Sequence, residues 1–162
     1  MTTNLAKALE YASLGIAIFP CNGKKPITKN GFKDATAYIE IIKKWWTLHP
    51  EANIAIATGK INNIEVLDID RKHDGFNSLK QILSKNGPLP TNYVVKTGGG
   101  GFHFYFKYSD RSYSNRTSIL PGIDFKTDGG YVIAPPSFHE NGNQYKWIEF
   151  NFYNFMNGGE EC

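Results

Sequence analysis

Hydrophobic and polar residues along the chain repeat with two periods, one typical of helices and one typical of strands. Leu5, Ala8 and Leu9 recur at the spacing that places side chains on one face of an α-helix. In "GFHFYFKY" apolar and polar residues instead alternate one by one, which is typical of a β-strand with one buried face. These patterns predict helices around residues 5–12, 36–50 and 75–87, and strands at residues 15–20, 53–59, 64–70, 92–97, 101–108, 122–126, 130–135 and 144–150.

The order of these elements indicates an α+β domain on a mostly antiparallel sheet, because helices crowd the first half while strands occur in both halves. Pro20 is expected to end the first strand, since proline has no N–H to donate. Segments 53–59 and 64–70 are the best candidate for a hairpin, with a turn at "GKINN". We expect one domain over residues 1–150, followed at residues 151–162 by a tail that begins a linker in a longer parent protein.

Three of the predicted strands combine an apolar face with a face of charged or imidazole side chains. Because side chains alternate across a strand, Asp68 and Asp70 share one face of "EVLDID" with Val66, and Leu67 and Ile69 lie on the other. By the same rule His103 lies opposite the phenylalanines of "FHFYF", which we expect in the core. Asp124 and Lys126 likewise point away from the core in "GIDFK". If the three strands belong to one sheet, these side chains converge on one surface that faces away from the core.

A surface with three crowded carboxylates is a candidate site for a hard divalent cation. Asp68, Asp70 and Asp124 repel one another, and a bound cation removes that repulsion. Mg²⁺ and Mn²⁺ prefer carboxylate and water oxygens, and two such ions about 3.5–4 Å apart can stabilise both oxygens of a phosphoryl displacement. His103 and Lys126 would then contact a triphosphate, beside the backbone N–H groups of "TGGGG". Zinc is disfavoured because no Cys or His pair has ligand spacing.

Each of these features also has an ordinary structural explanation. An aspartate pair at a strand end is commonly just solvated, and four glycines commonly form a flexible turn. An acid with a nearby lysine often makes only a surface ion pair, and His103 alone could equally be a solvent-facing strand residue. The functional interpretation therefore depends on the side-chain parity that the three strands share.

Composition limits the cellular setting and the partners. The formal net charge is +3 and the isoelectric point is about 8.8, a mildly basic balance that is compatible with a nucleic-acid or phosphate ligand. Cysteine occurs only at Cys21 and Cys162, so no disulfide framework is expected, and we expect a cytoplasmic location. No signal peptide and no apolar run near the roughly 18 residues of a membrane span is visible, so no membrane partner is expected.

At these residues the sequence resembles the bifunctional DNA primase/polymerase (prim-pol) N-terminal domain of the archaeo-eukaryotic primase superfamily. The resemblance runs from "LGIAIFPCNGKKP" to "YKW". It includes a helix with paired tryptophans followed by "NIAIATG", and then the motifs "VLDID", "TGGGGFHFYF" and "GIDFKTDGGYVIAPPS". The order and spacing of these blocks make the match more specific than any single motif. It implies an N-terminal helix-rich half and an RRM-like catalytic half.

The resemblance also implies roles for individual residues. Asp68, Asp70 and Asp124 would be catalytic and would bind two ions, Mg²⁺ or Mn²⁺. Many relatives carry a serine in the glycine loop, two residues before the histidine or slightly earlier, and its absence here would remove one hydroxyl contact to phosphate. Contacts to the nucleotide would come from Thr97, Gly100, His103, Lys126, Lys25 and Ser137, with Lys24 as a weaker candidate than Lys25.

The implied function is template-directed DNA priming and polymerisation from nucleoside triphosphates, in the replication of a phage, plasmid or other mobile element. Its partners would be a single-stranded DNA template, a primer, and a helicase domain of the parent protein. Two other classes stay open. A non-catalytic nucleic-acid-binding module would need no metal, although the phenylalanines of "FHFYF" point into the core, where they cannot stack on bases. A metal-dependent nuclease or nicking replication initiator is the other, and the nicking type normally uses two histidines around one apolar residue, whereas "FHF" offers one.

Overall fold

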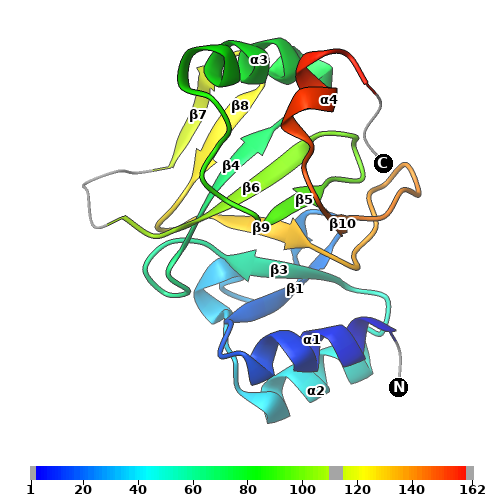
Figure 1. The fold of residues 1–162 in the computed structure, drawn as a ribbon. Coiled ribbons are helices and arrows are strands. Elements are labelled where there is room, and N and C mark those ends of the chain that lie inside the picture. The colour runs from blue at the N-terminus through cyan, green and yellow to red at the C-terminus, as the bar shows by residue number, and fades with distance from the viewer. Residues whose placement is uncertain (1–2, 110–114, 160–162) are drawn as a thin grey trace.

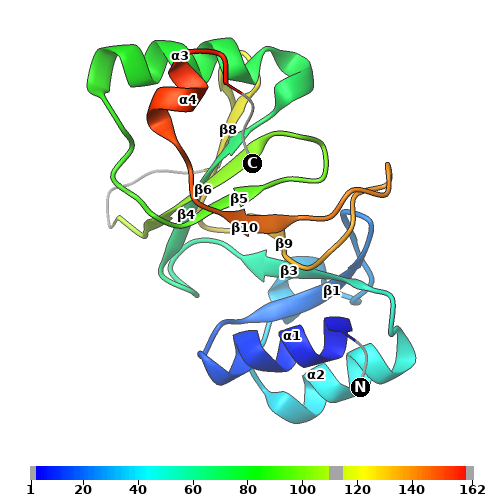
Figure 2. The same cartoon turned by 45° about the vertical axis from the view of Figure 1, so that its right-hand side comes forward.

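The computed structural model describes residues 3–109 and 115–159. These residues form four layers, in which two antiparallel sheets lie face to face between two pairs of helices (Figures 1 and 2). The arrangement confirms the α+β class with antiparallel strands, and it divides those strands between two sheets. Among the described residues no helix has the length and apolar character that a membrane crossing requires.

The first sheet, sheet A, is covered on its outer face by helices α1 (Thr3–Ser13) and α2 (Ile39–Leu48). Pro20 lies inside its first strand, so the prediction that Pro20 ends that strand is wrong. The Pro20 carbonyl accepts the N–H of Ile27. The next strand along the chain pairs with Cys21 and Asn22 but not with Pro20, so no hydrogen bond of that ladder requires an N–H at Pro20. In the order β2-β1-β3-β9, sheet A contains β1 (Ile18–Asn22), β2 (Lys25–Pro26), β3 (Asn53–Ala57) and β9 (Tyr131–Ala134), and the 3₁₀ turn η1 (Gly31–Asp34) precedes α2.

The second sheet, sheet B, has helices α3 (Gly75–Asn86) and α4 (Phe152–Met156) on its outer face (Figure 1). The predicted hairpin of β3 with the strand after it is wrong, because the two strands lie in different sheets. Both edges of each strand are already paired with other strands. Within the described residues, an isolated bridge from Gly59, just after β3, to Ile64 is the only β-pairing between the two segments. In the order β10-β5-β6-β4-β8-β7, sheet B contains β4 (Ile64–Ile69), β5 (Val94–Lys96), β6 (Phe102–Lys107), β7 (Arg116–Leu120), β8 (Ile123–Lys126) and β10 (Lys146–Ile148), and the 3₁₀ turn η2 (Arg71–His73) follows β4.

Helix α4 extends the packed structure beyond the boundary that the sequence indicated at residue 150. Its Phe155 is 4% exposed and meets the rings of Phe76 and Phe102 edge-on. Phe155 is therefore a core residue, and Phe152 and Met156 pack partly buried against the same cluster on the outer face of sheet B. The last residues of that tail, 160–162, lie outside the described residues.

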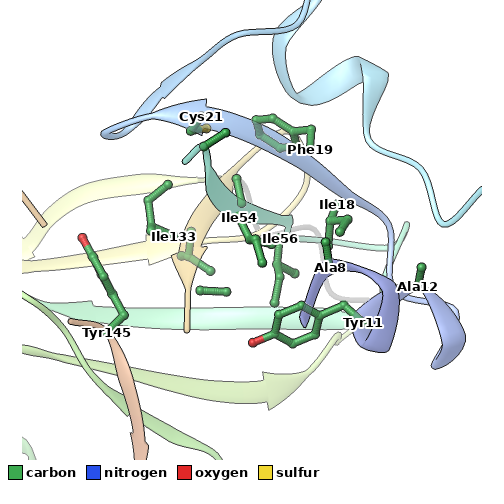
Figure 3. Packing of buried hydrophobic residues seen from close by; sticks show 14 of the residues in the cluster. Ala8, Tyr11, Ala12, Ile18, Phe19, Cys21, Ile54, Ile56, Ile133 and Tyr145 are labelled. Carbon is green, nitrogen blue, oxygen red and sulfur yellow. The ribbon is translucent and has the colours of Figure 1, made fainter. Parts of the chain in front are cut away.

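Both faces of sheet B are covered by apolar contacts. The phenylalanines Phe102 and Phe104 pack under α3 and α4, as the alternation predicted. The opposite face, which carries Asp68 and His103, packs against sheet A and not against solvent. Val66 and Tyr105 on that face belong to one buried cluster with sheet A and α1. In Figure 3, Tyr11 and Tyr145 lie on opposite sides of this inter-sheet cluster. The polar side chains on that face therefore point into the space between the two sheets and not toward the outer surface.

Candidate active site

The pairing of three central strands of sheet B brings the predicted acids and the histidine together. Asp68 on β4 lies directly opposite His103 on β6 and directly opposite Asp124 on β8. Paired strands are about 4.7–4.9 Å apart, so side chains on the shared face are immediate neighbours. The expectation that these strands belong to one sheet is confirmed. Asp68 therefore lies between an imidazole and a second carboxylate.

A cavity of about 990 Å³ opens between the two sheets over this row of residues. Its volume is at the upper end of the range for small-molecule sites, so a nucleotide would fit. Sheet A contributes one wall through β9, and sheet B contributes the other. Six of the nine predicted site residues line the cavity: Asp68, Asp70, Thr97, His103, Asp124 and Lys126.

Asp68 makes the central polar contact of the cavity. Nε2 of His103 lies 3.3 Å from Oδ1 of Asp68, and the side chains are 7% and 30% exposed respectively. Burial, the largest single influence, raises the pKa of Asp68, but His103 and then Lys126 and Lys24 together outweigh it. The pKa of Asp68 is therefore lower than usual, and the group is an ionised carboxylate at neutral pH.

His103 is more buried than its strand parity indicated. The prediction that its side faces solvent is wrong, because sheet A covers that face of β6. Its Nδ1 atom is buried and has no hydrogen-bond partner among the described residues. A buried polar atom in that state costs about 1–3 kcal/mol. The imidazole therefore leaves a hydrogen-bonding position unused in a residue that lines the cavity.

The other two acids already have cationic or polar partners. Asp70 follows β4 and accepts the N–H of Lys72 at 2.9 Å, while its second oxygen lies 2.6 Å from Nδ1 of His73. Asp124 lies 3.9 Å from Nζ of Lys126. In the part of the chain that the structure describes, no three acid, histidine or cysteine side chains come close enough together to hold a metal ion. The donor chemistry suits Mg²⁺ or Mn²⁺, but in this arrangement the acids contact groups of the chain itself.

The four glycines between β5 and β6 are explained mainly by close packing. A side chain at Gly98 or Gly101 would collide with neighbouring chain, since a Cβ at Gly101 would lie 1.9 Å from the carbonyl oxygen of Ile69. Gly100 has φ +87°, which disfavours other residues, and its N–H donates to Thr97 rather than toward the cavity. The position of Gly100 therefore does not support its predicted nucleotide contact. Gly99 alone lines the cavity with ordinary space around it.

Two further predicted nucleotide contacts lie away from the cavity. Lys25 is exposed in β2 and does not line it, whereas Lys24, the weaker candidate, does. Lys24 lies in the turn between β1 and β2, whereas Lys25 begins β2. Ser137 is fully buried, and its hydroxyl accepts the N–H of Ile54 at 2.8 Å. Its position indicates a structural role, in which it fastens the segment after β9 to β3.

Sequence reasoning missed the cavity-lining residues that come from sheet A and from the loops. Parity along a strand cannot locate loop residues, because they have no period. The available signal was adjacency to the motifs: Lys72 and His73 follow "VLDID", and His139 follows "APPS". Asp74, which follows His73, is exposed and does not line the cavity. The cavity-lining residues that had not been singled out include Lys72, His73, Tyr131, His139, Glu140 and Tyr145.

Comparison with protein families gives one match. Residues 8–154 match the family described as bifunctional DNA primase/polymerase, N-terminal. The matched stretch contains β4, β6 and β8 with their acids and histidine, and it extends into α4. The search of curated proteins gave no match.

Proposed function

Because the chain belongs to the bifunctional DNA primase/polymerase N-terminal family, we propose that it is a nucleotidyltransferase that makes DNA on a template from nucleoside triphosphates. The register that places Asp68 between His103 and Asp124, beside a cavity of nucleotide size, is the observation that carries this proposal. Its partners would be a single-stranded template and a primer. We further propose a role in the replication of a phage, plasmid or other mobile element.

Asp68, Asp70 and Asp124 are the residues that would hold divalent cations. All three line the same cavity, and the lowered pKa of Asp68 keeps that carboxylate charged. Bound Mg²⁺ or Mn²⁺ would neutralise charge on the transferring phosphate and lower the pKa of the attacking hydroxyl. His103 lies beside Asp68 and Lys126 lies beside Asp124, so each of these two acids has a positive or hydrogen-donating group close to it.

The proposed reaction joins a 3′-oxygen to the α-phosphorus of the incoming nucleotide. The bond between that phosphorus and the oxygen bridging to the β-phosphate breaks, pyrophosphate leaves with the electron pair, and the hydroxyl proton passes to water. The protein orients the triphosphate through cationic and imidazole groups on both cavity walls, Lys126 and His103 from sheet B and Lys24 from the loop between β1 and β2. No side chain is required as a dedicated base.

Replacing Asp68 with Asn tests the proposal with almost no change of shape. Primer extension on a single-stranded template with Mg²⁺ or Mn²⁺ should fall by at least about 100-fold, since a lost metal ligand removes several kcal/mol of transition-state stabilisation. Asp74→Asn is the matched control, because Asp74 is exposed outside the cavity and should leave extension unchanged. Extension by Asp68→Asn at the parent rate would refute the assignment.

Two controls separate this function from the other candidate classes. DNA incubated with the protein and metal but without nucleotides should remain intact, whereas cleavage would indicate a nuclease. A chelator should abolish extension. Binding of single strands that survives the chelator, with no extension before its addition, would instead indicate a non-catalytic binding module.

A further inference from the structure

We propose that His139 contacts the outer phosphates of the bound nucleoside triphosphate, an inference that rests on the proposed function. His139 belongs to the segment that joins β9 of sheet A to β10 of sheet B. Its side chain lines the cavity beside the glycine loop, and Tyr145 lines the same cavity. It therefore faces the site from a segment that carries none of the predicted acids.

The backbone around His139 is held firmly against the glycine loop. The side-chain amide of Asn141 donates to the carbonyl of Gly98 at 2.9 Å. A Cβ at Gly98 would lie only 2.2 Å from the Cβ of His139, so the two segments approach as closely as a glycine allows. The N–H of His139 also donates to the carbonyl of Asn143 at 2.8 Å, which closes the turn. The position of the imidazole relative to the glycine loop is thus fixed by the fold.

The hydrogen bonding of the ring determines which nitrogen can donate to a ligand. Nδ1 of His139 accepts the backbone N–H of Asn141 at 3.1 Å. In the neutral ring the proton therefore lies on Nε2, which is a donor. Nε2 lies 3.6 Å from the position that a Cβ on Gly99 would occupy, and it has no hydrogen bond within residues 3–109 and 115–159. A free donor thus lies beside Gly99, which lines the cavity and has ordinary space around it.

The surroundings indicate an anionic oxygen as the acceptor for this donor. Lys24 and Lys72 line the same cavity, and their charges favour phosphate over a neutral group. Glu140 is the acidic neighbour, and it is exposed. Under the proposed function the reacting α-phosphate lies at Asp68 and Asp124. A donor at the glycine loop then meets the β- or γ-phosphate.

Binding of dTTP and dTMP in the presence of Mg²⁺ and without DNA tests the contact. In His139→Ala, affinity for dTTP should fall about 10- to 100-fold, as expected for one lost hydrogen bond to a charged group, while affinity for dTMP stays unchanged. His139→Gln should recover part of the loss, because its amide N–H can replace Nε2–H. His49→Ala removes an exposed imidazole at the end of α2 and should change neither affinity.

The affinities of the parent and of the His139 variants for dTTP and dTMP test the His139 contact separately from the proposed function. Unchanged dTTP affinity in His139→Ala, with a parent that prefers dTTP to dTMP, overturns the His139 contact alone. An equal loss for dTTP and dTMP also overturns it, because the contact is then not to the outer phosphates. A parent that does not prefer dTTP refutes the proposed function, and this inference with it. If His139→Ala does not fold, the same comparison is made with His139→Phe, which keeps a ring but has no donor, so that loss of discrimination supports the contact and wild-type discrimination overturns it.

Discussion

Replacing Tyr105 with Phe should stabilise the protein, because it removes a hydroxyl that is buried without a hydrogen-bond partner among the described residues. Tyr105 is 6% exposed on β6 and belongs to the cluster between the two sheets. Its ring meets Trp147 at 5.1 Å between centroids, and that contact survives the change to Phe. Burial of its hydroxyl also raises the pKa of Tyr105 well above the usual value, which agrees with an apolar environment.

The magnitude follows from the cost of a buried unsatisfied hydroxyl, about 1–3 kcal/mol. Taking the lower end, Tyr105→Phe should raise the free energy of unfolding by about 1 kcal/mol, or Tm by about 2–4 °C for a chain of this length. The matched control is Tyr11→Phe, because Tyr11 lies in the same cluster but its hydroxyl donates to the carbonyl of Pro135 at 2.7 Å. Losing that bond should cost about 2 kcal/mol, or about 4–8 °C.

Thermal unfolding followed by circular dichroism, with urea unfolding at 25 °C as a second measurement, checks the two variants. The two Tyr→Phe changes delete the same atom from the same cluster, yet their effects should have opposite signs. A fall in Tm for Tyr105→Phe as large as that for Tyr11→Phe would show that the Tyr105 hydroxyl is satisfied, and the reasoning would be refuted. Primer extension should be unaffected, since Tyr105 does not line the cavity.

The glycine loop and the buried tyrosines support two further predictions. Gly101→Ala should lower Tm by several degrees because its Cβ would strike the Ile69 carbonyl, whereas Gly99→Ala should change Tm little, and equal effects would contradict the packing explanation. Burial raises the pKa of Tyr145 to about 12 and that of Tyr105 well above its usual value. The stability that these two neutral phenols contribute is therefore fully present below the usual tyrosine pKa of about 10, and it is lost as the pH rises above that value. Urea midpoints at pH 8 and pH 11 measure this fall, which should be smaller in Tyr105→Phe, and an equal fall in the two proteins would contradict it.

Local periodicity predicted the elements well but not their partners. The alternation in "FHFYF" correctly identified which side of β6 packs under α3. Side chains alternate across a strand, so the phenylalanines share one face, and that apolar face is the one that packs under the helix. The assignment of β3 and β4 to a hairpin failed because pairing depends on competition between edges, and other strands occupy all four edges. Helix α4 was missed because five residues are too few to show a helical period.

The site was predictable where it lies on strands and unpredictable where it lies on loops. Parity alone brought Asp68, His103 and Asp124 to one face, and the register confirms that grouping. It could not show that sheet A would cover this face, because that depends on how two sheets pack. It also could not distinguish Lys24 from Lys25, since Lys24, which lines the cavity, lies in a turn that has no period. The His139 side chain depends on a turn that has no periodic signature.

The chain passes between the sheets at three places in the described residues, from β3 to β4, from β8 to β9 and from β9 to β10. The first two passages are bonded to each other, because the Thr58 hydroxyl donates to the carbonyl of Thr127 and Asp128 accepts the N–H of Lys60. The third lies at the opposite end of the sheets (Figures 1 and 2). Residues of the second and third passages line the cavity, so both of its ends are tied.

Because the chain crosses between the sheets at both ends of the cavity, we expect the two sheets not to open as a hinge around a substrate. Under the proposed function the cavity would then be a preformed nucleotide site, and little chain entropy would be lost when it is filled. Selection among nucleotides would depend on the shape of the cavity walls and not on a closing movement.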